Sequence, residues 1–201
     1  MSHFSVAVFS RTPGDVEALL APFNEQVAPG DPYAVFVRDE SGQHDETGQA
    51  KGCWHNPNAR WDWWVIGGRW RGLLLLRPGK SGYIAPLEPW HKDFVYPPHR
   101  CDAALVADCD FSPNEAQIRR AARMWDEPRE DEDLLKLWEP EYYLERYGDK
   151  ETFIRRKTAF STYAFITAGG EWHEPGRMGW FGLDDATNES TNRYEAEIRA
   201  Y

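Results

Sequence analysis

The chain has 201 residues, of which 41% are hydrophobic and 28% charged. These proportions are ordinary for a globular protein, and the length suits a single domain spanning residues 1–201. No apolar run approaches the roughly 18 residues that a membrane-spanning helix needs, so the sequence predicts no membrane association. The amino terminus lacks the pattern of a secretory signal, and the three cysteines lack the spacing of a disulfide framework. A cytoplasmic location is therefore expected.

The net charge of −10 is unevenly distributed. Residues 126–151 hold 11 acidic and four basic side chains, whereas residues 54–77 hold four arginines and one aspartate. An acidic chain repels a long nucleic acid, which disfavours general nucleic-acid binding through phosphates. The local arginine cluster still suits a small anion of nucleotide size.

The first quarter of the chain predicts a strand, a helix, a second strand and a loop. Residues 4–10 form a short β-branched and aromatic run that is typical of a buried strand. The Thr-Pro-Gly-Asp sequence at 12–15 has a capping threonine and a first-turn proline, so it predicts a helix that ends near Pro22. Residues 33–38 indicate a second strand, and the polar residues 39–58 are predicted to form a mobile loop.

The second half of the chain predicts helices followed by a hairpin. A capping box that begins at Ser112 precedes a helical pattern, and residues 131–157, within and beyond the acidic segment, read as helical pieces interrupted by Pro140 and Gly148. Residues 161–174 predict a hairpin around a Gly-Gly pair. Together the elements predict an α+β domain with a mostly antiparallel sheet and helices packed on one face.

The densest pattern runs from Asn56 to Leu76, where tryptophans and arginines surround Gly67-Gly68. A Gly-Gly pair supplies the positive φ angles of a type I′ turn, so this segment is predicted to form a hairpin. Because side chains alternate across a strand, the register assigns one apolar set to the core: Trp61, Trp63, Val65, Trp70, Gly72, Leu74 and Leu76. The opposite face then holds Arg60, Asp62, Trp64, Ile66, Arg69, Arg71, Leu73 and Leu75.

Part of that opposite face is the candidate ligand-binding site, made of Arg60, Asp62, Trp64, Arg69 and Arg71. Guanidinium groups over an indole are a favourable cation–π arrangement, and the set is suited to stacking a base and holding a phosphate or carboxylate. Trp180 is the candidate second wall of this pocket. The alternative interpretation is purely structural, with Asp62 paired to a neighbouring arginine, and a bulge at the two glycines would exchange the faces.

The two tryptophan-rich hairpins are predicted to be neighbours in one sheet. A chain of this length folds to a radius of gyration of about 16 Å, so two apolar hairpins have little room to avoid each other. We expect Trp61, Trp63 and Trp70 in a shared core beside Phe165 or Tyr163.

Three long motifs carry a family resemblance: the opening MSHFSVAVFSRTPGDVEALLAPFNE, the block NPNARWDWWVIGGRWRGLL and the block YAFITAGGEWHEPGRMGWFG. The chain resembles a family of uncharacterised bacteriophage and prophage proteins with an MSHF start and NPNxxWDWxxIGGRW and GxWxExGxMGWWG motifs. The likeness covers about the first 23 residues, 56–74 and 159–183. It implies a phage setting and a host-cell cytoplasmic location. Phe181 stands where tryptophan is usual, and the chain ends at Tyr201 where family members continue into a further strand.

Three further groups of residues suggest metal or acid–base chemistry. A zinc site could draw on Cys53, His55, His99, Cys101 and Cys109, but the i, i+2 spacings are not those of common zinc sites, so no metal or other cofactor is expected. Asp102, Asp108 and Asp110 could hold Mg²⁺. His173, with a glutamate on each side, is a candidate general base.

The function predicted from these patterns is that of a non-catalytic binding protein. It would hold a small anionic, nucleotide-like ligand on the tryptophan and arginine face, and in a phage setting it would counter host signalling or defence. Two alternatives stay open: a hydrolase that acts on a nucleotide through a metal or through His173, and a module that binds and inhibits a host protein.

Overall fold

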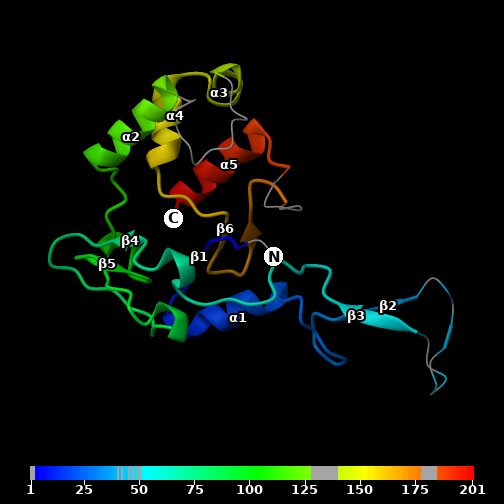
Figure 1. Ribbon diagram of the computed structural model, residues 1–201. Coiled ribbons are helices and arrows are strands. Elements are labelled where there is room, and N and C mark those ends of the chain that lie inside the picture. Colours follow the sequence, from blue (N-terminus) through cyan, green and yellow to red (C-terminus); the bar gives the residue numbers. More distant parts are fainter. Residues whose placement is uncertain are drawn as a thin grey trace.

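The computed structural model describes residues 3–39, 41, 43, 44, 46, 48, 51–127, 140–177 and 185–201. The strands are β1 (Val6–Val8), β2 (Val35–Arg38), β3 (Gly52–His55), β4 (Leu74–Leu75), β5 (Arg100–Cys101), β6 (Ala164–Ile166) and β7 (Trp172–His173). The α-helices are α1 (Val16–Leu20), α2 (Glu115–Asp126), α3 (Pro140–Tyr147), α4 (Lys150–Thr158) and α5 (Asn188–Arg199). Short 3₁₀ helices are η1 (Pro13–Asp15), η2 (Ala21–Phe23), η3 (Gly68–Trp70), η4 (Pro89–His91) and η5 (Val106–Asp108). The fold is α+β, as predicted (Figure 1), and no described helix is long and apolar enough to cross a membrane.

A three-stranded sheet in the order β1-β6-β7 forms the centre of the molecule. β1 is parallel to β6, and β6 is antiparallel to β7, so the predicted first strand and the predicted hairpin at 161–174 are both confirmed. Ile166 packs with Leu20 and Phe23 on one face, while Phe165 packs with Tyr194 and Ile198 of α5 on the other. α1 and α5 therefore cover opposite faces of the sheet (Figure 1), and the expectation of helices on one face only is wrong.

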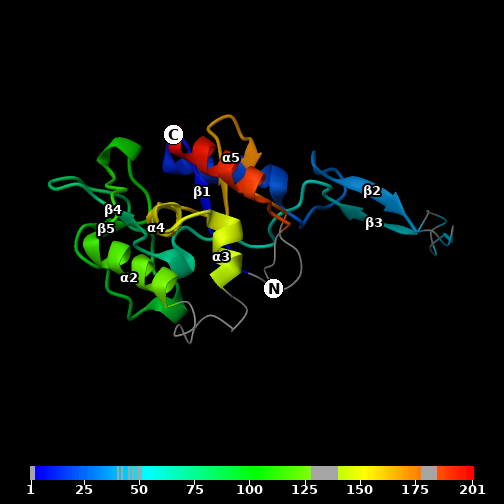
Figure 2. The same cartoon turned by 90° about the horizontal axis from the view of Figure 1, so that it is seen from above.

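Two further sheets of two strands each replace the single large sheet that was expected. β2 is the predicted second strand, and it pairs with β3, which lies inside the segment 39–58 that was predicted to be a loop. The β2–β3 ribbon projects away from the rest of the molecule in both views (Figures 1 and 2). β4 pairs with β5 in the third sheet, so residues far apart in the sequence supply its two strands.

The predicted hairpin over residues 56–76 is wrong, although its two glycines do adopt positive φ angles of 82° and 50°. Gly67 and Gly68 lead into η3 instead of a two-residue turn, and the strand that follows pairs with β5. The physical reason is the Asp102 carboxylate, which lies against this turn and accepts a hydrogen bond of 2.8 Å from the Gly72 N–H. A Cβ atom at Gly67 would lie 2.9 Å from that carboxylate, so only glycine fits.

The helices between the sheets follow the sequence pattern with one shift. The N-cap of α2 is Asn114 rather than Ser112, because the Asn114 side chain accepts from the Gln117 N–H at 2.9 Å. Pro140 begins α3, and Gly148, at a φ of 79°, separates α3 from α4, in agreement with the predicted helical pieces. Within the acidic segment 126–151, residues 128–139 lie outside the described residues.

Candidate ligand-binding cavity

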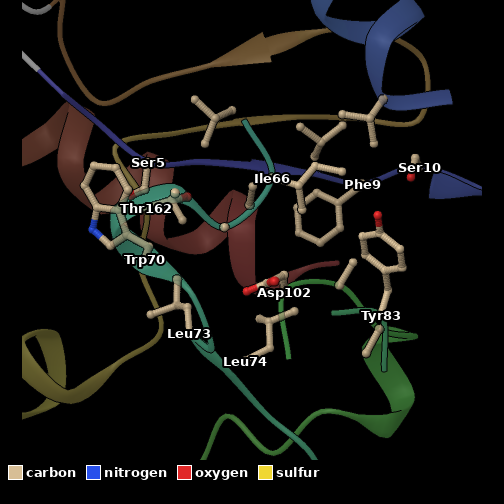
Figure 3. A pocket seen from close by; sticks show the side chains of 18 of the residues that line it. Ser5, Phe9, Ser10, Ile66, Trp70, Leu73, Leu74, Tyr83, Asp102 and Thr162 are labelled. Atoms are coloured by element: carbon tan, nitrogen blue, oxygen red, sulfur yellow. The ribbon is translucent and has the colours of Figure 1, made fainter. Parts of the chain in front are cut away.

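A cavity of about 1910 Å³ opens between the central sheet and the β4–β5 layer (Figure 3). Its walls are β1 with the residues that follow it, residues 60–70, residues 102–107 and the end of α5. Figure 3 labels some of the lining residues: Ser5, Phe9, Ser10, Ile66, Trp70, Leu73, Leu74, Tyr83, Asp102 and Thr162. Apolar and aromatic side chains predominate, as in most small-molecule sites.

Four of the six residues of the predicted site line this cavity, namely Arg60, Asp62, Trp64 and Arg69. Arg60 is half-buried, and its Nε lies 3.5 Å from a carboxylate oxygen of Glu174, so part of its charge is already neutralised. Trp64 packs against the hydrophobic cluster under the central sheet rather than standing on an open face. Trp180 lies outside the described residues.

The remaining site residue, Arg71, is buried and does not line the cavity, which corrects its predicted role as an anion clamp. Its guanidinium donates to the carbonyl oxygens of Ala85 and Pro86 at 3.2 and 2.7 Å, to the Tyr96 hydroxyl at 3.0 Å, and to the Glu88 carboxylate. The hydrogen bond from Arg71 lowers the pKa of Glu88 to about 2. Arg71 therefore holds the 85–96 segment in place and is not free to bind a ligand.

Asp102 completes this buried network from the cavity side. Its carboxylate, fully buried, accepts from the N–H groups of Gly72 and Ala85 at 2.8 and 2.9 Å and from the Tyr96 hydroxyl. The Arg71 guanidinium lies 3.8 Å away. Burial raises the pKa of Tyr96, and the hydrogen bond to Asp102 adds to this shift. With these donors around it, Asp102 fixes the cavity wall rather than offering a group to a ligand.

The tryptophans of the 61–70 stretch are distributed differently from the prediction. Trp61 packs in the core, and its indole N–H donates to the Leu20 carbonyl at 3.2 Å, as its core assignment requires. Trp63 and Trp70, also predicted to be buried, are 56% and 36% exposed. The error has a simple cause: without a hairpin, side chains do not alternate between two faces. The exposed Trp63 ring instead lies 6.2 Å from the ring of Trp90, and both line the cavity.

The two signature regions are neighbours, but they do not share a sheet. Trp61 and Trp64 pack against the same cluster as Trp172 and Ile166, and Arg60 pairs with Glu174. In the structure residues 60–64, which belong to no strand, make this contact with β6, with β7 and with the residue that follows β7.

Exposed arginines mark the rim of the cavity: Arg11, Arg69, Arg77 and Arg199. Arg77 donates through its Nε to the Cys109 carbonyl at 3.0 Å, and Arg199 pairs with Glu195 at 2.9 Å. Arg11 and Arg69 form no ion pair with any of the residues that the structure describes. The acidic lining residues are fewer, Glu25, Asp62 and Asp102, so the lining carries more positive than negative side chains in a chain of net charge −10.

The residues weighed for a metal site do not come together. Cys53 is exposed on the projecting ribbon, while Cys101 and Cys109 are buried beside β4, where burial raises the pKa of Cys101 to about 11. Asp108 pairs with Lys80, and Asp110 accepts from the Ser112 N–H. Over the described ranges, no group of three His, Cys, Asp or Glu side chains is placed to hold a metal ion.

His173, the candidate general base, has a partner that its sequence neighbours did not suggest. Its Nδ1 lies 3.0 Å from a carboxylate oxygen of Glu197 on α5, and its ring stacks on Phe165 at 4.5 Å between centroids. This arrangement joins β7 to α5, and the ring is not among the lining residues of the cavity.

Sequence reasoning missed Arg11 and Trp90 among the lining residues. Arg11 carries a recognisable signal, because it follows the carboxyl end of the predicted first strand, the end at which ligand sites of parallel sheets concentrate. Trp90 lies in a proline-rich stretch that no pattern connects with Trp63. Comparisons with protein-family models, with curated proteins and with solved structures give no match, so the functional argument rests on this geometry.

Proposed function

We propose that the protein is a non-catalytic binding protein whose cavity holds a small anionic ligand with an aromatic or apolar body, such as a nucleotide. The observation that carries the proposal is a cavity of about 1910 Å³ with apolar walls and two rim arginines, Arg11 and Arg69, that form no ion pair within the described part of the chain. A cavity with apolar walls and a few polar anchors is the usual form of a small-molecule site. In the phage setting that the sequence resemblance implies, the ligand would be a host nucleotide held out of circulation.

The rim residues supply the two interactions that such a ligand needs. Arg69 is exposed, and among the residues that the structure describes its guanidinium has no ion-pair partner, so it can form charge-assisted hydrogen bonds with a phosphate or carboxylate. The indoles of Trp63 and Trp90 are exposed by 56% and 65%, so aromatic surface is available for stacking beside the cavity. Arg69 lies in η3, Trp90 lies in η4 and Trp63 precedes η3, and all three side chains are exposed to solvent.

Isothermal titration calorimetry against a panel of nucleotides and cyclic nucleotides tests the proposal. Losing a charged hydrogen bond costs about 1.5–3 kcal/mol, so Arg69→Gln should weaken binding about tenfold to a hundredfold. Arg119→Gln is the matched control, because Arg119 is also exposed, lies on α2, pairs with Glu115 and does not line the cavity. Absence of saturable heat with every anion tested contradicts the proposal.

A protein-binding role is the second candidate, and the β2–β3 ribbon favours it. Val35, Phe36, Val37 and Trp54 are exposed by 46%, 37%, 45% and 41%, so the ribbon presents apolar side chains on both faces. Exposed apolar surface of this kind is typical of interaction sites. Affinity capture from host lysate with the wild type and with a Val35→Thr, Val37→Thr variant tests this role, and a partner retained equally by both would contradict binding through the ribbon.

A further inference from the structure

The cavity separates apolar walls from a charged rim. Val8, Phe9 and Ile66 are half-buried wall residues, whereas Arg11 and Arg69 are exposed. An amphipathic ligand matches such a gradient, because its apolar part leaves water while its charge stays at the surface.

The apolar walls of the cavity favour a hydrocarbon chain over a nucleotide. At about 1910 Å³ the cavity admits either ligand, so its volume does not discriminate between them. The ring nitrogens and hydroxyls of a nucleotide lose water without gaining hydrogen-bond partners where the walls are apolar. A hydrocarbon chain covers such a wall and gains free energy with every methylene group it buries.

The buried polar side chains of the walls are already bonded within the protein. Thr162 donates to the Ala164 carbonyl at 2.8 Å and lies 3.2 Å from the Tyr194 hydroxyl. Asp102 accepts from two backbone N–H groups and from Tyr96. Thr162 and Asp102 are therefore not available to form hydrogen bonds with the edge of a base. Binding at these walls would come mainly from the burial of apolar surface.

Arg69 is the rim cation best placed to hold the charged end. It lies in η3, a turn fixed by the hydrogen bond of 2.8 Å from the Trp70 N–H to the Gly67 carbonyl and by the Asp102 bond to the Gly72 N–H. A guanidinium presented from a fixed turn loses less conformational freedom on binding than one on a mobile loop.

We propose that the ligand of this cavity is an amphipathic anion, with a long hydrocarbon chain against the apolar walls and a carboxylate or similar anionic head beside Arg69. The inference rests on the proposed binding function and narrows it to one chemical class.

A series of octanoate, decanoate and dodecanoate, with 1-octanol as the neutral analogue and AMP as the nucleotide, tests the inference by calorimetry. Each buried methylene is expected to tighten binding about fourfold, so each step of two carbons should give about a 15-fold gain. Arg69→Gln should weaken the carboxylates at least tenfold and leave 1-octanol unchanged, while Arg119→Gln changes neither.

A pair of leucines tests the apolar wall separately. Leu73 is 38% exposed and lines the cavity, whereas Leu87 is 39% exposed and does not. Leu73→Gln should weaken decanoate at least fivefold because it places a polar group against the chain, and Leu87→Gln should have no effect. Both positions are exposed enough for the variants to fold, which circular dichroism will verify.

The outcomes separate the inference from the function on which it rests. If AMP binds in an Arg69-dependent way and no carboxylate shows chain-length dependence, the amphipathic ligand is wrong and the binding function stands. If neither class binds, both fail. Carboxylate binding that ignores both Arg69→Gln and Leu73→Gln also overturns the inference, because the ligand would then lie outside this cavity.

Discussion

Replacing Asp102 with asparagine should destabilise the protein by about 3 kcal/mol. The carboxylate is fully buried and accepts from the N–H groups of Gly72 and Ala85 at 2.8 and 2.9 Å and from Tyr96. An asparagine keeps one acceptor oxygen and turns an NH₂ group toward a donor, so at least one hydrogen bond to a charged group, worth about 1.5–3 kcal/mol, is lost. The buried Arg71 also loses one of the two carboxylates near it, which adds to the cost.

Equilibrium urea denaturation, followed by tryptophan fluorescence, measures this change. Asp108→Asn is the control, since that carboxylate makes a half-exposed pair with Lys80 at 2.8 Å and should contribute less than about 1 kcal/mol. A free energy of unfolding for Asp102→Asn within about 0.5 kcal/mol of the wild type would show that the buried network around Asp102 does not stabilise the fold.

Three further predictions concern the same region. The pKa of Glu88 is lowered from 4.5 to about 2 in the folded state, so the ionised carboxylate stabilises the fold above pH 4.5 and this stabilisation is lost as the pH falls toward 2. In urea titrations at a series of fixed pH values, the difference in unfolding free energy between the wild type and Glu88→Gln should therefore shrink over that interval. Trp61→Ala should lower the free energy of unfolding by about 3 kcal/mol, and Trp63→Ala by less than about 1 kcal/mol. Equal losses would contradict the assignment of Trp61 to the core and of Trp63 to the surface. Gly67→Ala should be clearly more destabilising by thermal denaturation than Gly79→Ala, because both have positive φ but only Gly67 faces a buried carboxylate.

The local elements were predictable where their signals were local. β1 is a short β-branched run, and the hairpin of β6 and β7 surrounds a Gly-Gly turn, so composition and spacing suffice to identify both. The start of α2 was shifted by two residues because Ser112 and Asn114 are both good caps, and only the reciprocal bond with Gln117 selects Asn114.

The segment 56–76 was not predictable from pattern alone because distant residues determine it. Gly67-Gly68 does adopt positive φ, but Asp102 turns the chain there, and the following strand pairs with Arg100–Cys101. Periodicity contains no information about a partner some 30 residues away, so the assumed hairpin placed Trp63 in the core and Arg71 on the binding face. Composition located the region of the cavity, whereas the direction of each side chain depended on the tertiary fold.

Calorimetry of three proteins with decanoate and AMP tests whether the cavity binds a small anion through Arg69. We expect saturable binding to the wild type, the same affinity for Arg119→Gln, and an affinity at least tenfold weaker for Arg69→Gln. Equal affinities for all three proteins, or no saturable heat with either compound, would contradict this expectation.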